Sequence, residues 1–228
     1  MTTTRSRIDP RKVVAVLDAL EPIVAAAVAA DEAAHPGQRG RCIGASRVGA
    51  LVLARLGIKA TATPCATLAT TEAYRDALRR NVDARDQAAA EALVEAGAFC
   101  MHVGPADRGS VLKGTEAWTT RPLERAPGRP FDGHVVLNVE RRWLVDLTAG
   151  QMNRPERGLH VPATVRLDVK PWATGRHTRA WMDLEAGGLL EYRRTGDTSY
   201  LTGTAWTSIE PHSPEVLALA DRLAVHLS

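Results

Sequence analysis

The chain has 228 residues, of which 45% are hydrophobic and 24% charged, and these values are typical of a globular protein with one sizeable core. The net charge is only +3, and acids are interspersed among the arginines, so we do not expect nucleic-acid binding. Three widely spaced cysteines, Cys42, Cys65 and Cys100, exclude a disulfide framework, and no Cys/His cluster indicates a metal site.

Neither of two stretches in the N-terminal region predicts targeting to a membrane. The stretch MTTTRSRIDPRK lacks the apolar core of a signal peptide. The longest apolar-rich run, PIVAAAVAADEAA, is too short and too rich in alanine to span a bilayer. We therefore expect a cytoplasmic protein with free thiols and no membrane partner, and the oligomeric state stays open.

The first predicted element is a helix. Asp9 followed by Pro10 is typical of a helix start, because aspartate caps the first turn and proline fits its first position. Helical spacing continues through VVAVLDALEPIVAAAV, in which Pro22 either kinks or splits the helix. A loop over 35–41 follows.

A helix and a strand come next. Apolar residues recur with helical spacing over 42–56, and Gly57 is a natural terminator. The alternating segment IKATAT then predicts a strand that ends at Pro64. Cys42 therefore stands at the beginning of a helix that packs in the core.

Residues 65–130 predict an insertion or cap over this core. Two polar-faced helices are expected over 70–82 and 84–96, and Gly97 ends the second. The region 104–130 is rich in Gly, Pro and Arg and predicts a long loop.

The remainder favours strands. GHVVLNVE and WLVDLT alternate well and predict a hairpin with a tight turn at Arg141-Arg142. Three further strands and a final helix are expected in TVRLDV, RAWMDLE, GLLEYRR and PEVLALADRLAVHL. No repeat or linker divides the chain, so residues 1–228 are expected to form a single α+β domain.

Three residues of these elements could act together on a carbonyl. Cys42 lies at a helix N-terminus, where unpaired N–H groups favour a thiolate. His134 could accept the thiol proton, and Asp146 could fix the histidine tautomer. A turn at Arg141-Arg142 would place Asp146 opposite Leu137, so the two side chains share a face only with a bulge or a one-residue shift in register.

The segments RCIGASRVGALVLARLGIKATAT and GHVVLNVERRWLVDLT resemble the transglutaminase-like branch of the papain-like cysteine enzymes. The resemblance implies a helix that bears the cysteine and packs on an antiparallel sheet, here with a helical insertion. It also implies that Cys42 is the nucleophile, His134 the general base and acid, and Asp146 the orienting residue. The implied activity is a peptidase, amidase or transglutaminase-like transfer through a thioester, on a peptide, protein or small amide or acyl substrate, with no metal or organic cofactor.

Two departures and two alternatives accompany this interpretation. The family often has an aromatic residue after the cysteine or the histidine, where this chain has Ile43 and Val135. The approach RGRC resembles the arylamine N-acetyltransferases, whose longer pattern around the cysteine is missing. The other alternative is a non-catalytic interaction protein that retains the fold.

Acyl transfer also needs an oxyanion hole, which commonly combines the N–H of the nucleophile with one more donor. Gln38 could supply that donor from its side chain, Gln151 could contact the oxyanion or the substrate, and Trp118 could cover the substrate pocket.

The other two thiols are expected to be structural. Cys100 and His102 form a rival pair, but no helix N-terminus supports that thiol. His102 could still line the pocket.

Overall fold

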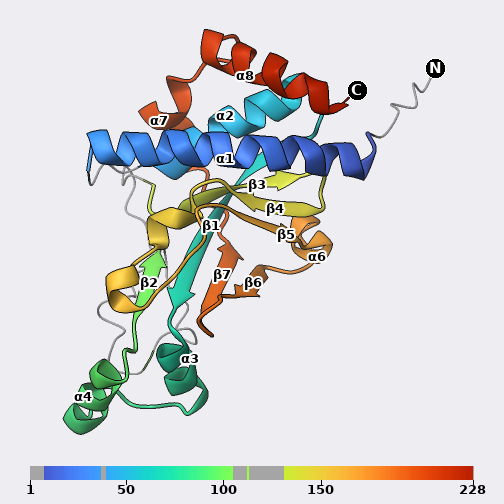
Figure 1. Cartoon of the computed structure of the whole chain (residues 1–228). Coiled ribbons are helices and arrows are strands. Elements are labelled where there is room, and N and C mark those ends of the chain that lie inside the picture. Colours follow the sequence, from blue (N-terminus) through green and yellow to red (C-terminus); the bar gives the residue numbers. More distant parts are fainter. Residues whose placement is uncertain (1–7, 37–39, 105–111, 113–130, 228) are drawn as a thin grey trace.

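The computed structural model describes residues 8–36, 40–104, 112 and 131–227. Within these ranges the chain is an α+β protein, in which helices cover an antiparallel, nearly closed, barrel-like sheet (Figure 1). The sheet has the strand order β5-β4-β3-β1-β7-β6, and β2 pairs with β1 outside this path. The strands are β1 (Ala60–Thr70), β2 (Cys100–Val103), β3 (His134–Val139), β4 (Trp143–Asp146), β5 (Val165–Asp168), β6 (Arg179–Asp183) and β7 (Leu189–Arg194).

Three of the helices, α1, α2 and α8, lie together on one side of the sheet (Figure 1). The α-helices are α1 (Pro10–Ala34), α2 (Arg41–Arg55), α3 (Glu72–Arg79), α4 (Gln87–Glu95), α6 (Lys170–Ala173), α7 (Thr204–Thr207) and α8 (Pro214–Ala224). The 3-10 helices are η2 (Ala149–Met152), η3 (Pro155–Arg157), η4 (Ser199–Thr202) and η5 (Val225–Leu227).

α1 begins where the sequence predicts. Asp9 caps it by accepting a hydrogen bond from the Arg11 N–H at 2.8 Å, and Pro10 is its first residue. The helix runs through Pro22 without interruption, so the proline does not split it. One face enters the main core through Val13, Val16, Leu17, Leu20 and Val24.

α1 is also long and apolar enough to cross a membrane, judged by length and composition alone. Its 25 residues extend well beyond the run 22–34 considered in the sequence. Core helices and signal sequences pass the same test, and α1 contributes five residues to the core, so the absence of a membrane partner stays a prediction.

The helix–glycine–strand unit is confirmed, but the strand is longer than predicted. α2 ends near Gly57, which has a φ of +75°, and β1 then runs from Ala60 through Pro64 to Thr70. Pro64 accepts a hydrogen bond from the Thr195 N–H at 3.0 Å, just beyond the end of β7. The Pro64 nitrogen also faces β7, at a point where the β1–β7 pairing has already ended. The missing N–H of the proline therefore interrupts no strand pairing.

The β3–β4 hairpin differs from the prediction by one residue. Glu140 and Arg141 occupy the turn, both with positive φ, and Leu137 is paired with Val145. This register places Asp146 opposite Val136, two residues from His134 and on the same face. The turn covers residues 140–142 and so is one residue longer than the predicted Arg141-Arg142, and the resulting one-residue shift in register is the arrangement in which His134 and Asp146 share a face.

The segment predicted as an insertion begins inside the sheet, because residues 65–70 belong to β1. After them come the predicted helices, shortened to α3 and α4, and the unpredicted strand β2. These elements extend away from the α1–α2–α8 layer (Figure 1). A small apolar cluster holds them together, including Tyr74, Ala77, Cys100 and Leu112. That this segment is an insertion or cap stays a prediction.

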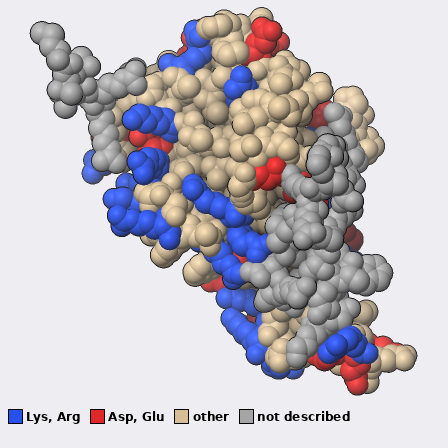
Figure 2. All heavy atoms as spheres, turned by 180° about the vertical axis from the view of Figure 1, so that it is seen from behind, with Lys and Arg blue, Asp and Glu red and all other residues tan. Residues whose placement is uncertain are grey.

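Basic side chains form a band on the face seen in Figure 2. Several arginines of the described chain form ion pairs with carboxylates, as in Arg142–Asp168 and Arg166–Asp18, both at 2.5 Å. That the protein binds no nucleic acid stays a prediction.

Candidate active site

Cys42 is the second residue of α2 and is almost buried, with 6% of its surface exposed. Gly40 precedes the helix with a φ of +91°, a conformation that favours glycine, and its carbonyl accepts from the N–H groups of Ile43 and Gly44. The Cys42 N–H lies in the first turn, where the helix itself offers no acceptor. The thiol therefore stands at the positive end of a helix.

Two contacts fix the start of α2. Arg41, with only 7% of its side chain exposed, forms ion pairs with Asp31 and Glu32 near the end of α1. Ser46 donates to the Val135 carbonyl at 2.8 Å, which joins the next turn of α2 to the residue after His134. Cys42 is thus held relative to both α1 and β3.

His134 and Asp146 form a buried pair. The distance from His134 Nε2 to Asp146 Oδ2 is 2.8 Å, and both side chains are at least 97% buried, with exposures of 3% and 0%. Tyr192 donates its hydroxyl to the same Oδ2 at 2.9 Å. Thr148 donates to Oδ1 through its N–H at 2.9 Å and its hydroxyl at 3.2 Å. Both carboxylate oxygens are therefore satisfied.

The electrostatics favour an ion pair. Burial opposes the charged form of His134, but the charge of Asp146 and the Cys42 side chain outweigh it and hold the imidazole pKa well above its usual value. Burial likewise opposes ionisation of Asp146, but His134, Thr148 and Tyr192 keep the carboxyl pKa below its usual value. Burial and the Asp146 charge raise the pKa of Tyr192, so its hydroxyl stays a donor.

The His134 tautomer follows from these contacts. Nε2 is bound to Asp146, so Nδ1 is the ring nitrogen left for Cys42, which lines the same pocket as His134. An imidazolium beside a thiol favours the thiolate, which is the nucleophilic form. The geometry can therefore generate a nucleophile and return a proton.

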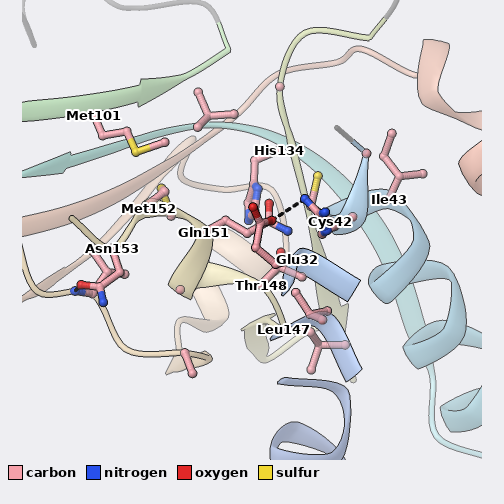
Figure 3. Close-up of a pocket in the computed structure, with 18 of the residues that line it drawn as sticks. Glu32, Cys42, Ile43, Met101, His134, Leu147, Thr148, Gln151, Met152 and Asn153 are labelled. Carbon is pink, nitrogen blue, oxygen red and sulfur yellow. Dashed lines mark hydrogen bonds and ion pairs between the residues drawn. The ribbon is translucent and has the colours of Figure 1, made fainter. Parts of the chain in front are cut away.

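A pocket of about 990 Å³ opens at this point. Figure 3 shows Cys42 and His134 close together on its wall, with Gln151 beside them. Apolar side chains from several elements complete the lining, among them Val28, Met101, Leu147 and Met152.

The structure brings together four of the predicted site residues, namely Cys42, His134, Asp146 and Gln151. Gln38 and Trp118 lie outside the described residues. His102 lines the pocket, as expected, and its Nδ1 is 3.2 Å from the Gly104 carbonyl oxygen. Burial lowers the pKa of His102 and so favours its neutral form.

The other two thiols are placed differently. Cys65 is fully buried directly opposite His134 in the sheet, and burial raises its pKa far above the ordinary value. Cys100 belongs to the cluster around Tyr74, and burial raises its pKa as well. Among the described residues, no group of three or more His, Cys, Asp or Glu is arranged to hold a metal ion.

Sequence reasoning missed three contributors to the site. Thr148 had a local signal, because Asp followed two residues later by Thr is typical of a turn in which the carboxylate accepts from the backbone. Tyr192 and Arg41 had none, since their partners lie on other elements. A scan against family models and searches of curated proteins and of solved structures found no match to this chain. The functional conclusion therefore depends on the site itself.

Proposed function

We propose that this protein is a cysteine-dependent enzyme that acts on an amide or acyl carbonyl through a thioester, with a core of the transglutaminase-like type. The observation that supports this most is the buried His134–Asp146 pair beside a cysteine at a helix N-terminus, at the wall of an open pocket. A buried charge pair costs desolvation, and a structural role alone does not explain why it faces a thiol.

The residues divide the reaction among them. The Cys42 thiolate attacks the carbonyl carbon and forms a carbon–sulfur bond, while the carbonyl electron pair moves to the oxygen. When the tetrahedral intermediate collapses, the bond to the leaving nitrogen or oxygen breaks and His134 Nδ1 protonates that atom. Water or an amine then attacks the thioester, gives its proton to His134, and releases the Cys42 thiolate. Asp146 holds the imidazole orientation throughout.

Peptides, proteins and small amides or acyl compounds are the proposed substrate class. Hydrolysis and transfer share the same thioester and differ in which nucleophile resolves it. An interaction protein that merely retains the fold has no need of this ion pair, which is why we favour the enzyme.

Selective alkylation tests the proposal. At about pH 6 an ordinary thiol is less than about 1% ionised, because its pKa is about 8.5. We expect iodoacetamide to modify Cys42 at least about tenfold faster than free cysteine under these conditions, and His134→Ala to remove most of that advantage. Mass spectrometry of proteolytic peptides would locate the adduct.

Two results would count against the enzyme: slow, equal labelling of all three cysteines, or an unchanged Cys42 rate in His134→Ala. Incubation with acetyl-CoA separates the acetyltransferase alternative, which requires an acetyl group on Cys42. An unmodified intact mass removes that alternative and leaves the broader proposal in place.

A further inference from the structure

We infer that Gln151 Nε2 is the side-chain donor of the oxyanion hole and acts with the backbone N–H of Cys42. This inference rests on the proposed function and deepens it, because it assigns a catalytic residue to the same site.

The argument starts from an unsatisfied donor. Gln151 Nε2 is buried, yet it has no hydrogen-bond partner within the described chain. Buried polar atoms are nearly always paired, so one that lacks a partner calls for an explanation. Among the described residues that line the pocket, no other has a buried side-chain atom without a hydrogen-bond partner. Gln151 is thus singled out at the site where a substrate oxygen would arrive.

Several other polar groups around the pocket already have partners. Thr148 is bound to Asp146, and the Asn153 side-chain oxygen accepts from the Val161 N–H at 3.0 Å. Arg154 donates to the carbonyls of Gln151 and Asn153, at 2.9 and 2.6 Å. Gln151 Nε2, which has no such partner within the described chain, lies next to Cys42 and His134 (Figure 3).

The backbone of Gln151 is fixed before any ligand binds. It lies in η2, five residues after Asp146, and its N–H donates to the Thr148 carbonyl at 3.0 Å. The preceding Gly150 donates to the Ala163 carbonyl and approaches so closely that an added Cβ would lie 3.0 Å from Ala163 Cα. The turn that holds Asp146 through Thr148 therefore also presents Gln151, and a preorganised donor is the kind that stabilises a transition state.

The chemistry matches the position. As the Cys42 thiolate attacks, the carbonyl oxygen becomes an oxyanion and needs donors that are aimed at it in advance. The Cys42 N–H supplies one hydrogen bond and Gln151 Nε2 the second. When the intermediate collapses, the carbonyl re-forms and both donors are released unchanged.

The test compares a reaction that forms an oxyanion with one that does not. Acylation by p-nitrophenyl acetate proceeds through a tetrahedral oxyanion, whereas alkylation by iodoacetamide displaces iodide at a saturated carbon. We expect Gln151→Ala and Gln151→Met to slow acylation of Cys42 on the order of 10²-fold, and to change alkylation by less than about twofold. Nitrophenolate release and the added acetyl mass report the first rate.

Matched variants keep the result interpretable. Gln151→Met preserves side-chain volume without a donor, so it guards against collapse of the pocket in Gln151→Ala. Gln87→Ala, at an exposed glutamine on α4, should change neither rate. Thermal melting of each variant reports folding.

The outcomes separate the two proposals. Wild-type acylation rates in both folded Gln151 variants would overturn the oxyanion role, and so would equal losses of acylation and alkylation, which would mean that Gln151 acts on the thiol. A wild-type Cys42 that neither alkylates selectively nor acylates would instead overturn the proposed function itself.

Discussion

Asp146 is fully buried and accepts four hydrogen bonds, two on each carboxylate oxygen, from His134, Tyr192 and Thr148. A buried carboxylate is stable only when its lone pairs are satisfied in this way. The site therefore depends on a tyrosine 46 positions further along the chain as much as on the histidine beside it.

Removing the Tyr192 hydroxyl tests this dependence. We predict that Tyr192→Phe lowers the free energy of unfolding by about 1.5–3 kcal/mol, because a hydrogen bond to a charged group is lost. Tyr200→Phe is the matched control, since that hydroxyl donates to a neutral acceptor, the Ala62 carbonyl, at 3.1 Å, and about 0.5–1.5 kcal/mol is expected. Urea denaturation measures both, and equal losses would contradict the charged role of Asp146.

At the scale of elements, the position of Cys42 depends on how closely α2 approaches the sheet. Gly49 faces β3, and an added Cβ would lie 2.8 Å from the side chains of both Leu137 and Leu147, which are themselves buried. Gly44, one and a half turns earlier, has nothing nearer than 3.7 Å. The helix therefore requires glycine at position 49, whereas position 44 has room for a larger residue.

Alanine at these two positions should change the free energy of unfolding in opposite directions. Gly49→Ala is predicted to lower the free energy of unfolding by about 1–3 kcal/mol, because overpacking outweighs the gain in helix propensity. Gly44→Ala is predicted to raise it by about 0.5–1 kcal/mol, because only the propensity changes. Denaturation curves check both, and a stabilising Gly49→Ala would show that the helix can shift away from the sheet.

For the whole molecule, the ion pair links stability to pH. The raised pKa of His134 contributes stability that is complete below its unfolded value of about 6.5 and is lost as the pH rises through the folded pKa. The lowered pKa of Asp146 contributes stability that is complete above its unfolded value of about 3.9 and is lost as the pH falls through the folded pKa. Both contributions are present together between about pH 4 and pH 6.5.

We predict that the difference in unfolding free energy between the wild type and Asp146→Asn is largest in this window. It should decline on either side, by at most about 1.4 kcal/mol per pH unit for one proton. Denaturation over a series of pH values measures it. A difference that does not vary with pH would mean that the pair is not charged in the folded protein.

Features that depend on near neighbours could be predicted from the residues alone. Asp9 and Gly57 mark helix ends because caps act within one turn, and the strands of the β3–β4 hairpin were found because alternation is local. The order Cys42, His134, Asp146 on a helix and a hairpin was also visible, as was Gln151 after the second strand.

Features that depend on distant partners became evident only in the folded chain. β1 continues past Pro64 because residues 65–70 pair with β7, and β2 exists because β1 offers it an edge. The hairpin register, the Tyr192 hydrogen bond and the unpaired Gln151 amide depend on contacts between elements that no spacing along the chain encodes. Local signals therefore located the candidate site residues, whereas long-range packing decided how they are oriented.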